Sequence, residues 1–293
     1  MSIIFITGGT GFLGSNLIKS LNYERNDIWV IKRSISATNR LDGYESKINY
    51  FNIEEGLSKL FESKKEVETI IHLATNRGRN NEKEEEVYRV NFDFPKELFD
   101  LSLSFNVSTF INADTGLPPD FDVHTSSKKK FKNYAKKEIK ESNMKFFNLE
   151  IENFFGPNDS EGQFTTQLIS SCLKDLDKID LSSGNQIRDF FHIQDLIECI
   201  NHIMKCSTKL DKGFYNLPVG SGEAIPLKFF CSLVKKKTGS KIKLNFGAIP
   251  YRENEVMNSV ADLSDIKKLG WTPRISLSKA IDMTLKDWKF KYY

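Results

Sequence analysis

The chain of 293 residues is long enough for one large domain or for two interlocked ones. Its 42 basic and 39 acidic residues leave a formal net charge of +3, so neither a nucleic acid nor a membrane surface is expected as a partner. We find no apolar run near the roughly 20 residues of a membrane helix and no basic leader before the first strand. The four cysteines lack Cys-x-x-Cys spacing, which predicts reduced thiols in a cytoplasmic protein.

The first motif is a glycine-rich turn between a strand and a helix. Residues 3–6 are apolar and predict a buried strand, and apolar residues from 13 to 21 recur at helical spacing. Between them Gly8, Gly11 and Gly14 form Gly-x-x-Gly-x-x-Gly. Because glycine has no Cβ, such a turn lets backbone N–H groups at a helix N-terminus approach a pyrophosphate. The context predicts dinucleotide binding; the alternative is an ordinary glycine turn.

The second predicted strand, residues 28–31, ends in two basic residues, Lys32 and Arg33. An acidic residue at this point typically takes the ribose 2′-OH of NAD, whereas a base can pair with the 2′-phosphate of NADP. Arg33, with Lys32 or Ser34, therefore favours NADP. The alternative is a solvated basic pair at the end of a strand.

Short strands and helices alternate through the next part of the chain. Because such alternation is typical of a parallel sheet covered on both faces, the predicted class is α/β, a Rossmann-type doubly wound sheet. The acidic run at 82–86 and most of the seven lysines between 128 and 140 predict solvated helix faces, and residues 215–222 predict a loop. Further strands are predicted at 50–53, 67–73, 107–112 and 146–151, and helices at 87–104, 128–140 and 277–288.

Three residues suited to acid–base chemistry stand close together in the sequence. His124 and Lys128 are four residues apart and share one face of a predicted helix, and Thr115 ends the preceding strand. At this point the chain resembles the extended short-chain dehydrogenase/reductases of the nucleotide-sugar epimerase, dehydratase and reductase group, over nearly its whole length. The motifs that carry the resemblance are residues 7–14 (TGGTGFLG), 71–75 (IHLAT), Asn91, 188–190 (RDF), Arg252 with Glu255, and 269–273 (LGWTP).

Within that group the chain most resembles CDP-abequose and CDP-paratose synthase-type 4-ketosugar reductases, through residues 70–75, 185–191 and 246–256. The resemblance implies an NADP(H)-dependent oxidoreductase, with NAD as the alternative cofactor, that reduces a 4-keto-deoxysugar nucleotide in surface-polysaccharide (lipopolysaccharide) sugar biosynthesis. An epimerase with retained cofactor and a catalytically silent cofactor-binding relative are the alternatives. A homodimer is also implied. The expected cofactor-binding residues are Gly8, Thr10, Gly11, Phe12, Leu13, Gly14, Arg33, Ser34, Asn52, Ile53, Leu73, Ala74, Thr75, Asn91 and Lys128.

The resemblance also implies two lobes. Residues 1–155 with 188–212 are expected to form the NADP-binding domain, and residues 156–187 with 213–293 a smaller interlaced α/β lobe for the nucleotide sugar. We expect that lobe to close over the carboxyl edge of the sheet, where ligands bind in such folds.

The family's catalytic set is Ser/Thr, Tyr and Lys, and this chain departs from it at one position. Thr115 and Lys128 match, but His124 stands where the family has Tyr, and none of the nine tyrosines has Lys four residues later. Histidine can donate and accept protons from a reference pKa of about 6.5, and nearby Lys128 favours its neutral form. Three interpretations of His124 follow. It is the acid/base of a reductase that slows as the pH rises, it is a bystander while a water or Thr115 moves the proton, or it belongs to a catalytically silent site.

The predicted substrate residues lie in the second half of the chain. Arg188 and Arg252 match the family's arginines for the substrate pyrophosphate, and guanidinium offers the planar donors that such a group needs. Glu150 stands where the family often has Arg, and Arg188 has an alternative reading as an ion pair with Asp189 or Asp195. His72, His192 and His202 are expected to be structural, and no metal site is expected. The full substrate set is Asn153, Phe164, Arg188, Arg252 and Glu255.

Overall fold

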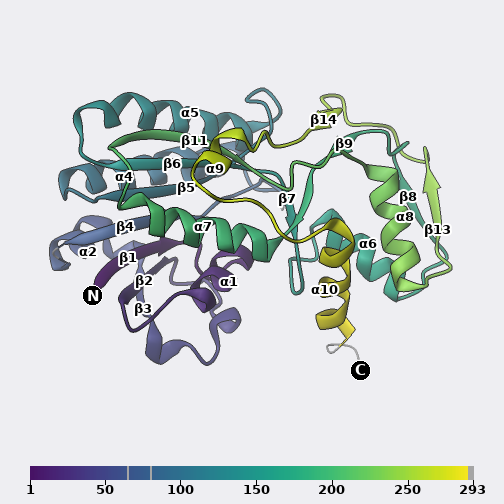
Figure 1. Ribbon diagram of the computed structural model, residues 1–293, viewed down its shortest axis with the longest axis horizontal. Helices are drawn as coiled ribbons and strands as arrows, with labels where there is room; N and C mark the ends of the chain where they lie inside the picture. Colours follow the sequence, from purple (N-terminus) through teal and green to yellow (C-terminus); the bar gives the residue numbers. More distant parts are fainter. Residues whose placement is uncertain (65, 80, 290–293) are drawn as a thin grey trace. The chain divides into compact units, whose positions relative to one another are not determined.

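The computed structural model describes residues 1–64, 66–79 and 81–289. The chain packs as two compact units, which we describe separately (Figure 1). The first comprises Met1–Glu150 and Ile200–Leu217, and the second comprises Ile151–Cys199 and Pro218–Tyr293.

A seven-stranded sheet forms the centre of the fold, in the order β11-β6-β5-β4-β1-β2-β3. The five strands from β5 to β3 pair in parallel, with Thr7 beside His72 of β4 and Ile31 of β2. The sheet confirms the Rossmann-type doubly wound fold. Its strands are β1 (Ser2–Thr7), β2 (Asn26–Lys32), β3 (Asn49–Asn52), β4 (Val67–His72), β5 (Thr109–Thr115), β6 (Lys145–Ile151) and β11 (Gly213–Val219).

Helices cover both faces of this sheet because alternate strand residues are apolar on both sides. Phe5 and Phe110 belong to a core that includes Phe61, Phe99 and Phe131 from helices α2, α4 and α5. Ile18 of α1 lies beside Val30 on the opposite side. The helices are α1 (Phe12–Ser20), α2 (Leu57–Ser63), α3 (Glu84–Tyr88), the π-helix η4 (Arg89–Asp93), α4 (Phe94–Ser104), α5 (Val123–Glu138) and α7 (Ile193–Ser207), with short 3-10 turns η1 (Asn39–Leu41), η2 (Glu45–Lys47), η3 (Ile53–Glu55) and η5 (Ile139–Glu141).

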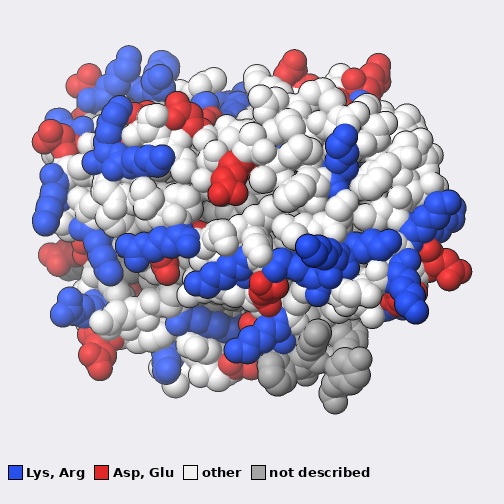
Figure 2. Space-filling view, turned by 45° about the vertical axis from the view of Figure 1, so that its right-hand side comes forward, with Lys and Arg blue, Asp and Glu red and all other residues white. Residues whose placement is uncertain are grey.

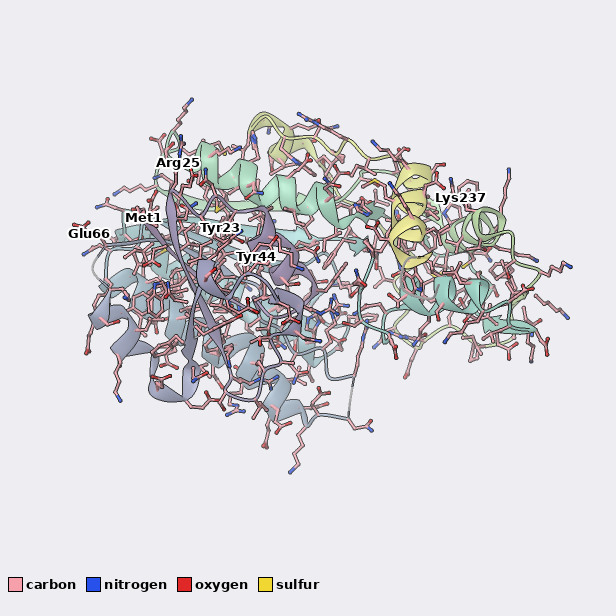
Figure 3. All side chains as sticks on the ribbon, turned by 90° about the horizontal axis from the view of Figure 1, so that it is seen from below. Met1, Tyr23, Arg25, Tyr44, Glu66 and Lys237 are labelled. Atoms are coloured by element: carbon pink, nitrogen blue, oxygen red, sulfur yellow. The ribbon has the colours of Figure 1, made fainter. Side chains whose placement is uncertain are left out.

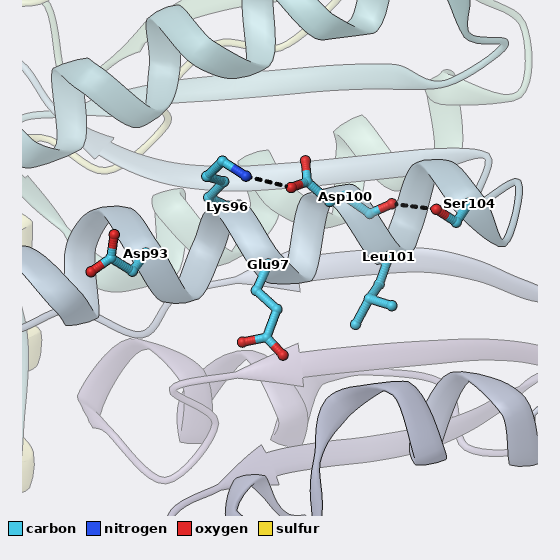
Figure 4. Close-up of a pocket in the computed structure, with 6 residues that line it drawn as sticks. All are labelled: Asp93, Lys96, Glu97, Asp100, Leu101 and Ser104. Atoms are coloured by element: carbon cyan, nitrogen blue, oxygen red, sulfur yellow. Dashed lines mark hydrogen bonds and ion pairs between the residues drawn. The ribbon is translucent and has the colours of Figure 1, made fainter.

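Polar contacts near the surface of the first unit join neighbouring helices and loops. On α4, Asp100 accepts hydrogen bonds from Lys96 and from Tyr134 of α5, both at 2.7 Å, beside a shallow hollow of about 370 Å³ (Figure 4). The rings of Tyr23 and Tyr44 lie 6.0 Å apart (Figure 3), and the Lys47 ammonium lies within 5.4 Å of both centroids. These contacts hold α4 against α5, and the segment after β2 against the end of α1.

The second unit has its own core of short strands and helices. Phe155, Phe190 and Phe230 meet there, and the Phe190 and Phe230 rings stack at 4.0 Å. Asp195 stabilises the segment before the last helix by accepting the N–H groups of Arg274 and Ile275. The elements are β7 (Asn153–Phe155), α6 (Phe164–Leu173), β8 (Lys178–Leu181), β9 (Ile187–Arg188), β10 (Phe190–His192), β12 (Ile225–Pro226), α8 (Leu227–Thr238), β13 (Lys243–Phe246), β14 (Asn258–Ser259), α9 (Ser264–Lys268) and α10 (Leu277–Lys289).

The predicted elements of the first 151 residues are confirmed, with shifts at their ends, whereas the loop prediction for residues 215–222 is wrong for 215–219 and correct for 220–222. Residues 213–219 form β11, which pairs with β6 at one edge of the seven-stranded sheet. The division of the chain also differs from the expected boundaries. Residues 151–155 and 188–199 pack with the second unit, because β7 pairs with β10 there, and residues 213–217 pack with the first.

On the face seen in Figure 2, basic and acidic side chains are interspersed with uncharged ones, in keeping with a net charge of +3. Over the described ranges, no helix combines the length and the apolar character that a membrane span requires. Cys172, Cys199 and Cys231 are buried free thiols, and Cys206 is half-buried.

Candidate active site

The glycine turn has the geometry that its spacing predicts. Gly8 has φ +68°, and a Cβ there would lie 2.6 Å from the backbone nitrogen of Ala74. Gly14 is equally constrained, since its Cβ would lie 2.3 Å from the carbonyl oxygen of Gly8. The Gly11 N–H donates to that same oxygen at 3.0 Å, and α1 begins at Phe12 directly after it. The turn is therefore closed by backbone contacts that a side chain at either position would break.

The same turn fits a pyrophosphate. A Cβ on Gly11 would meet Gly8 O at 3.2 Å and no other described atom within 4 Å apart from its chain neighbours, so the outer side of the turn is open. The first turn of α1 carries no acidic residue, and the N–H groups at a helix N-terminus suit an anion. Thr10 and Leu13 are half-buried and Phe12 is buried against the domain.

Where β2 ends, the structure adds a residue that the sequence analysis missed. Arg33 and Ser34 are exposed, as a 2′-phosphate site requires. The Glu54 carboxylate accepts the Ser34 N–H at 3.1 Å and the Ser34 hydroxyl at 3.2 Å. Glu54 lies in η3, which directly follows β3. Because Lys32 at the end of β2 pairs with Asn52 at the end of β3, η3 lies beside the segment that carries Ser34. An acidic side chain therefore lies beside the end of β2, although the residues that follow β2 are basic, and it comes from the connection after β3.

Asn52 and Ile53 lie at the start of the same connection. Asn52 ends β3 and caps η3, where its N–H donates to Glu55 at 3.3 Å and its side chain accepts a backbone N–H in return. Ile53 is half-buried and packs on the aromatic core of the sheet. Both residues therefore lie beside the segment that carries Glu54.

At the end of β4, Thr7 holds the segment that follows. Its hydroxyl oxygen accepts the Ala74 N–H at 3.2 Å and lies 2.7 Å from His72 Nδ1, and its carbonyl accepts the Leu73 N–H. Burial, with a smaller effect of the Lys128 charge, lowers the pKa of His72 to about 3. His72 is therefore a neutral, structural histidine that fixes the chain where the glycine turn packs against it.

Asn91 organises the residues that come next. It is 2% exposed, on the π-helix η4, and its side-chain amide donates to the carbonyls of Asn76 (2.7 Å) and Val87 (2.9 Å). Its carbonyl oxygen accepts the Asn76 N–H at 3.1 Å and the Thr75 hydroxyl at 3.0 Å. Thr75 and Asn91, both predicted cofactor-binding residues, are thereby joined.

His124 lies in the first turn of α5, and Lys128 lies one turn later. Asp122 caps the helix by accepting the Thr125 N–H at 2.7 Å. His124 Nε2 lies 3.2 Å from the Thr75 hydroxyl oxygen, and Lys128 Nζ donates to the Ala113 carbonyl of β5 at 2.7 Å. The fold therefore brings His124 and Lys128 to the carboxyl ends of β4 and β5.

Both groups are buried, and burial sets their charge. Burial lowers the pKa of His124 to about 2, and the positive charges of Lys128, Arg77 and Arg79 act in the same direction. Burial lowers the pKa of Lys128 to about 8; Asp114 opposes this shift, whereas Arg77 and Lys129 add to it. At neutral pH the His124 imidazole is therefore uncharged, as expected from the sequence, and the Lys128 ammonium loses its proton near pH 8.

Thr115 ends β5, as predicted, and is half-buried. Its hydroxyl oxygen accepts the Leu117 N–H at 3.2 Å, and its carbonyl accepts a hydrogen bond from Lys129. In the described part of the chain, the hydrogen-bond partner of His124 Nε2 is Thr75 and not Thr115. A role for Thr115 in substrate binding therefore stays a prediction.

Next to this group lies a buried cluster of charges that the sequence analysis did not foresee. Lys129 lies 3.2 Å from Asp114 and 2.7 Å from Glu150, and Lys132 lies 3.0 Å from Glu150. Burial raises the pKa of Glu150, but hydrogen bonds from Lys129, Asn216 and Lys132 outweigh it and bring it to about 2. Most of the seven lysines between 128 and 140 were expected on a solvated face, and only the neighbouring strands reveal that Lys129 has carboxylate partners.

The predicted substrate residues belong to the second unit. Arg188 forms an ion pair with Glu255 and donates to the carbonyls of Ile187 and Val256, which joins two of the predicted residues. Of the other predicted substrate residues, Arg252 and Asn153 are exposed, and Phe164 packs at the edge of the core.

The alternative ion-pair partners of Arg188 accept hydrogen bonds from backbone N–H groups instead. Asp189 accepts the N–H groups of Ser221 and Gly222 at 2.8 Å, and Asp195 accepts those of Arg274 and Ile275. The partner of Arg188 is instead Glu255, 67 residues away in the sequence. Both aspartates therefore shape the backbone of the second unit.

With this geometry established, comparison with known proteins identifies the family. Residues 4–217 match the model of the NAD dependent epimerase/dehydratase family. The chain belongs to this family. The match confirms the resemblance read from the sequence motifs, and it spans the glycine turn, Asn91, His124 and Lys128.

Individual relatives are similar to this chain over nearly its whole length. CDP-abequose synthase of Salmonella muenchen is 30% identical over 290 residues, which are 96% of this chain and 96% of that protein. The structure of UDP-glucose 4-epimerase of Thermotoga maritima with UDP-glucose has a TM-score of 0.86 at 19% identity, over 99% of this chain and 100% of the other. UDP-glucuronic acid 4-epimerase of Bacillus cereus, solved with UDP-glucuronic acid and NAD, has a TM-score of 0.84 at 21% identity, over 99% and 100%. The two structures confirm the fold.

Proposed function

We propose that this protein is an NADP(H)-dependent oxidoreductase that reduces a 4-keto-deoxysugar nucleotide during surface-polysaccharide sugar biosynthesis. The observation that carries the proposal is the placement of His124 and Lys128 at the carboxyl ends of β4 and β5, in the unit that holds the glycine turn. The full-length similarity to CDP-abequose synthase supports the substrate class.

The first unit would hold the cofactor. The turn around Gly11 would bind its pyrophosphate, Arg33 would pair with a 2′-phosphate, and Leu73 and Ala74 would line its path. Lys128 would bind the nicotinamide ribose. The bound nicotinamide would supply the hydride for reduction. NAD is the alternative, supported by the family and by the carboxylate of Glu54 beside Ser34.

The proton for the reduced oxygen would come from the pair His124 and Lys128. A neutral imidazole cannot be the store of that proton, because its pKa lies near 2. The Lys128 ammonium, whose pKa is about 8, loses its proton far more readily than an ordinary lysine. We assign the stored proton to Lys128 and a relay to His124, and Thr115 would hydrogen-bond the sugar oxygen.

The second unit would bind the nucleotide sugar. Arg188, pre-oriented by Glu255, and Arg252 would contact the substrate pyrophosphate, Asn153 would hydrogen-bond it, and Phe164 would pack near the base.

We also propose that the protein is a soluble homodimer in the cytoplasm. Sedimentation analysis would then give a mass of about twice the 33.7 kDa of the monomer, and a single monomeric species would refute the dimer.

An epimerase is the second candidate, and the neutral state of His124 favours it. An epimerase first removes a proton from a sugar hydroxyl, and an uncharged imidazole is ready to take one. Such an enzyme returns the hydride and tends to retain its cofactor, whereas a reductase exchanges it. An absorbance spectrum of the purified protein therefore separates the two candidates.

The decisive experiment follows NADPH consumption with 4-keto-6-deoxysugar nucleotides in the wild type, His124→Ala and His124→Tyr. We expect turnover in the wild type and a loss of about 10²-fold in the alanine variant, the usual contribution of a proton-transfer group. Unchanged turnover in His124→Ala would remove His124 from the mechanism. Turnover only in His124→Tyr would mean that the natural protein is a catalytically silent relative.

A further inference from the structure

The hydrogen bonds around Asn91 determine which way its side-chain amide points. Its nitrogen faces two carbonyl oxygens, of Asn76 and Val87, which can only accept. Its oxygen faces the Asn76 N–H, which can only donate. The reverse orientation would break all three contacts, so the Asn91 oxygen must be the atom that faces the Thr75 hydroxyl.

This orientation settles the direction of the next hydrogen bond. A hydroxyl has one proton, and at 3.0 Å Thr75 gives it to the Asn91 oxygen, which accepts only. Toward His124 Nε2, 3.2 Å away, the Thr75 oxygen can then only accept. His124 Nε2 must therefore carry a hydrogen. In a neutral imidazole the other nitrogen, Nδ1, holds the lone pair.

We propose that Thr75, oriented by Asn91, fixes His124 in the Nε2–H tautomer, so that every proton His124 exchanges with a ligand passes through Nδ1. Thr75 and Asn91 are then positioning residues for His124. Nδ1 lies 3.9 Å from Asp122 Oδ1, and this carboxylate would stabilise the imidazolium formed when Nδ1 takes a proton. The tautomer itself does not depend on the reaction; only its use in catalysis rests on the proposed function.

Nitrogen-15 NMR of histidine-labelled protein tests the proposal without any substrate. The chain has four histidines, and the His124 signals are those that disappear in His124→Gln. In the wild type and in Thr75→Ser we expect a protonated Nε2 and an unprotonated Nδ1. In Thr75→Val the ratio of the two tautomers should move toward Nδ1–H by roughly five- to tenfold, the effect of losing one neutral buried hydrogen bond.

A matched control removes another buried hydroxyl of the first unit. Ser102 on α4 donates to the Leu98 carbonyl at 2.6 Å, so Ser102→Ala should leave the His124 tautomer unchanged. The His72 signals report whether the end of β4 stays folded, and Thr75→Ala makes the same test where Thr75→Val does not fold. A wild type in the Nδ1–H form, or a Thr75→Val ratio equal to that of Ser102→Ala, would overturn the proposal.

A kinetic readout separates this proposal from the proposed function. If the enzyme turns over, Thr75→Val should lower kcat with little change in KM, and Thr75→Ser should restore it, because only the orientation of a proton-transfer group changes. If the wild type turns over no substrate while the Nε2–H tautomer is observed, the proposed function fails and the assignment of Thr75 stands.

Discussion

Two groups of side chains on α5 are close together in sequence, and both reach below the surface, yet they differ in chemistry. His124 Nε2 faces the hydroxyl oxygen of Thr75 and Lys128 faces a carbonyl oxygen, whereas Lys129 and Lys132 face the carboxylates of Asp114 and Glu150. With its ammonium bonded to a carbonyl, burial lowers the pKa of Lys128 to about 8, a value suited to proton transfer near neutral pH. A buried lysine bonded to a neutral carbonyl therefore has a lowered pKa and can transfer a proton, whereas a buried lysine paired with carboxylates has a structural role.

The largest expected effect comes from removing Lys128, the lysine that donates to the Ala113 carbonyl. Lys128→Met should lower kcat/KM by about 10³-fold, since it removes both a proton store and a cofactor contact. Lys129→Met should leave the activity per folded molecule within about threefold, because its charge serves Asp114 and Glu150. Steady-state kinetics on both variants compares the two groups, and equal losses would abolish the distinction.

Lys129 should matter more for the free energy of unfolding than it does for activity. Lys129→Met removes the cation beside the buried Asp114 and leaves Glu150 with Lys132 alone, so it should lower the free energy of unfolding by about 3–5 kcal/mol. Lys137→Met is the control on the same helix, because its pair with Glu138 is largely exposed and should contribute less than about 1 kcal/mol. Urea denaturation measures both. A Lys129→Met variant as stable as Lys137→Met would show that the buried cluster does not stabilise the fold.

The pH profile tests which group stores the proton. A donor must hold its proton, and Lys128 loses it as the pH rises through about 8, so reduction should slow about tenfold per pH unit above that point. An acid role for His124 alone would require its pKa to stay near the ordinary value of about 6.5, and the rate would then fall around that pH. Residual activity in Lys128→Arg should be flat through pH 8. A decline centred near 6.5 would return the proton store to His124.

Acid should destabilise the fold through its buried neutral histidines. The pKa of His72 is about 3 in the folded protein and about 6.5 when unfolded, so the unfolded chain binds more protons between these values. Stability from this group is therefore complete above about pH 6.5 and falls by about 1.4 kcal/mol per pH unit below it. His72→Phe should weaken this dependence in thermal unfolding between pH 4 and 7. The same slope in the variant would exclude His72 as its cause.

The smallest expected effect concerns the choice of cofactor. Glu54→Gln removes a negative charge beside Ser34 and should increase the preference for NADPH over NADH by about fivefold, the effect of one exposed charge close to a phosphate. Glu55→Gln, which changes the neighbouring capping carboxylate, is the control. Kd values from cofactor fluorescence give the ratio. Unchanged selectivity would place the 2′ position of the cofactor away from Glu54.

The sequence by itself determined the features that depend on local geometry. The spacing of Gly8, Gly11 and Gly14 after an apolar strand requires a tight turn, and the period of apolar residues required the α/β alternation. The neighbourhood of His124 and Lys128 followed from a helical spacing of four residues. Each of these depends on residues close together in the chain, and the family match confirmed the resemblance that the motifs indicate.

Only the tertiary structure decided the partners of the ionisable groups. The pairing of β2 with β3 brings Glu54 to Ser34, the end of β4 and η4 bring Thr75 and Asn91 to His124, and β6 brings Glu150 to Lys129. Strand 213–219 was missed for the same reason, since its place at the sheet edge depends on pairing with β6. Charge and tautomer follow from neighbours in space, and a sequence pattern records neighbours along the chain.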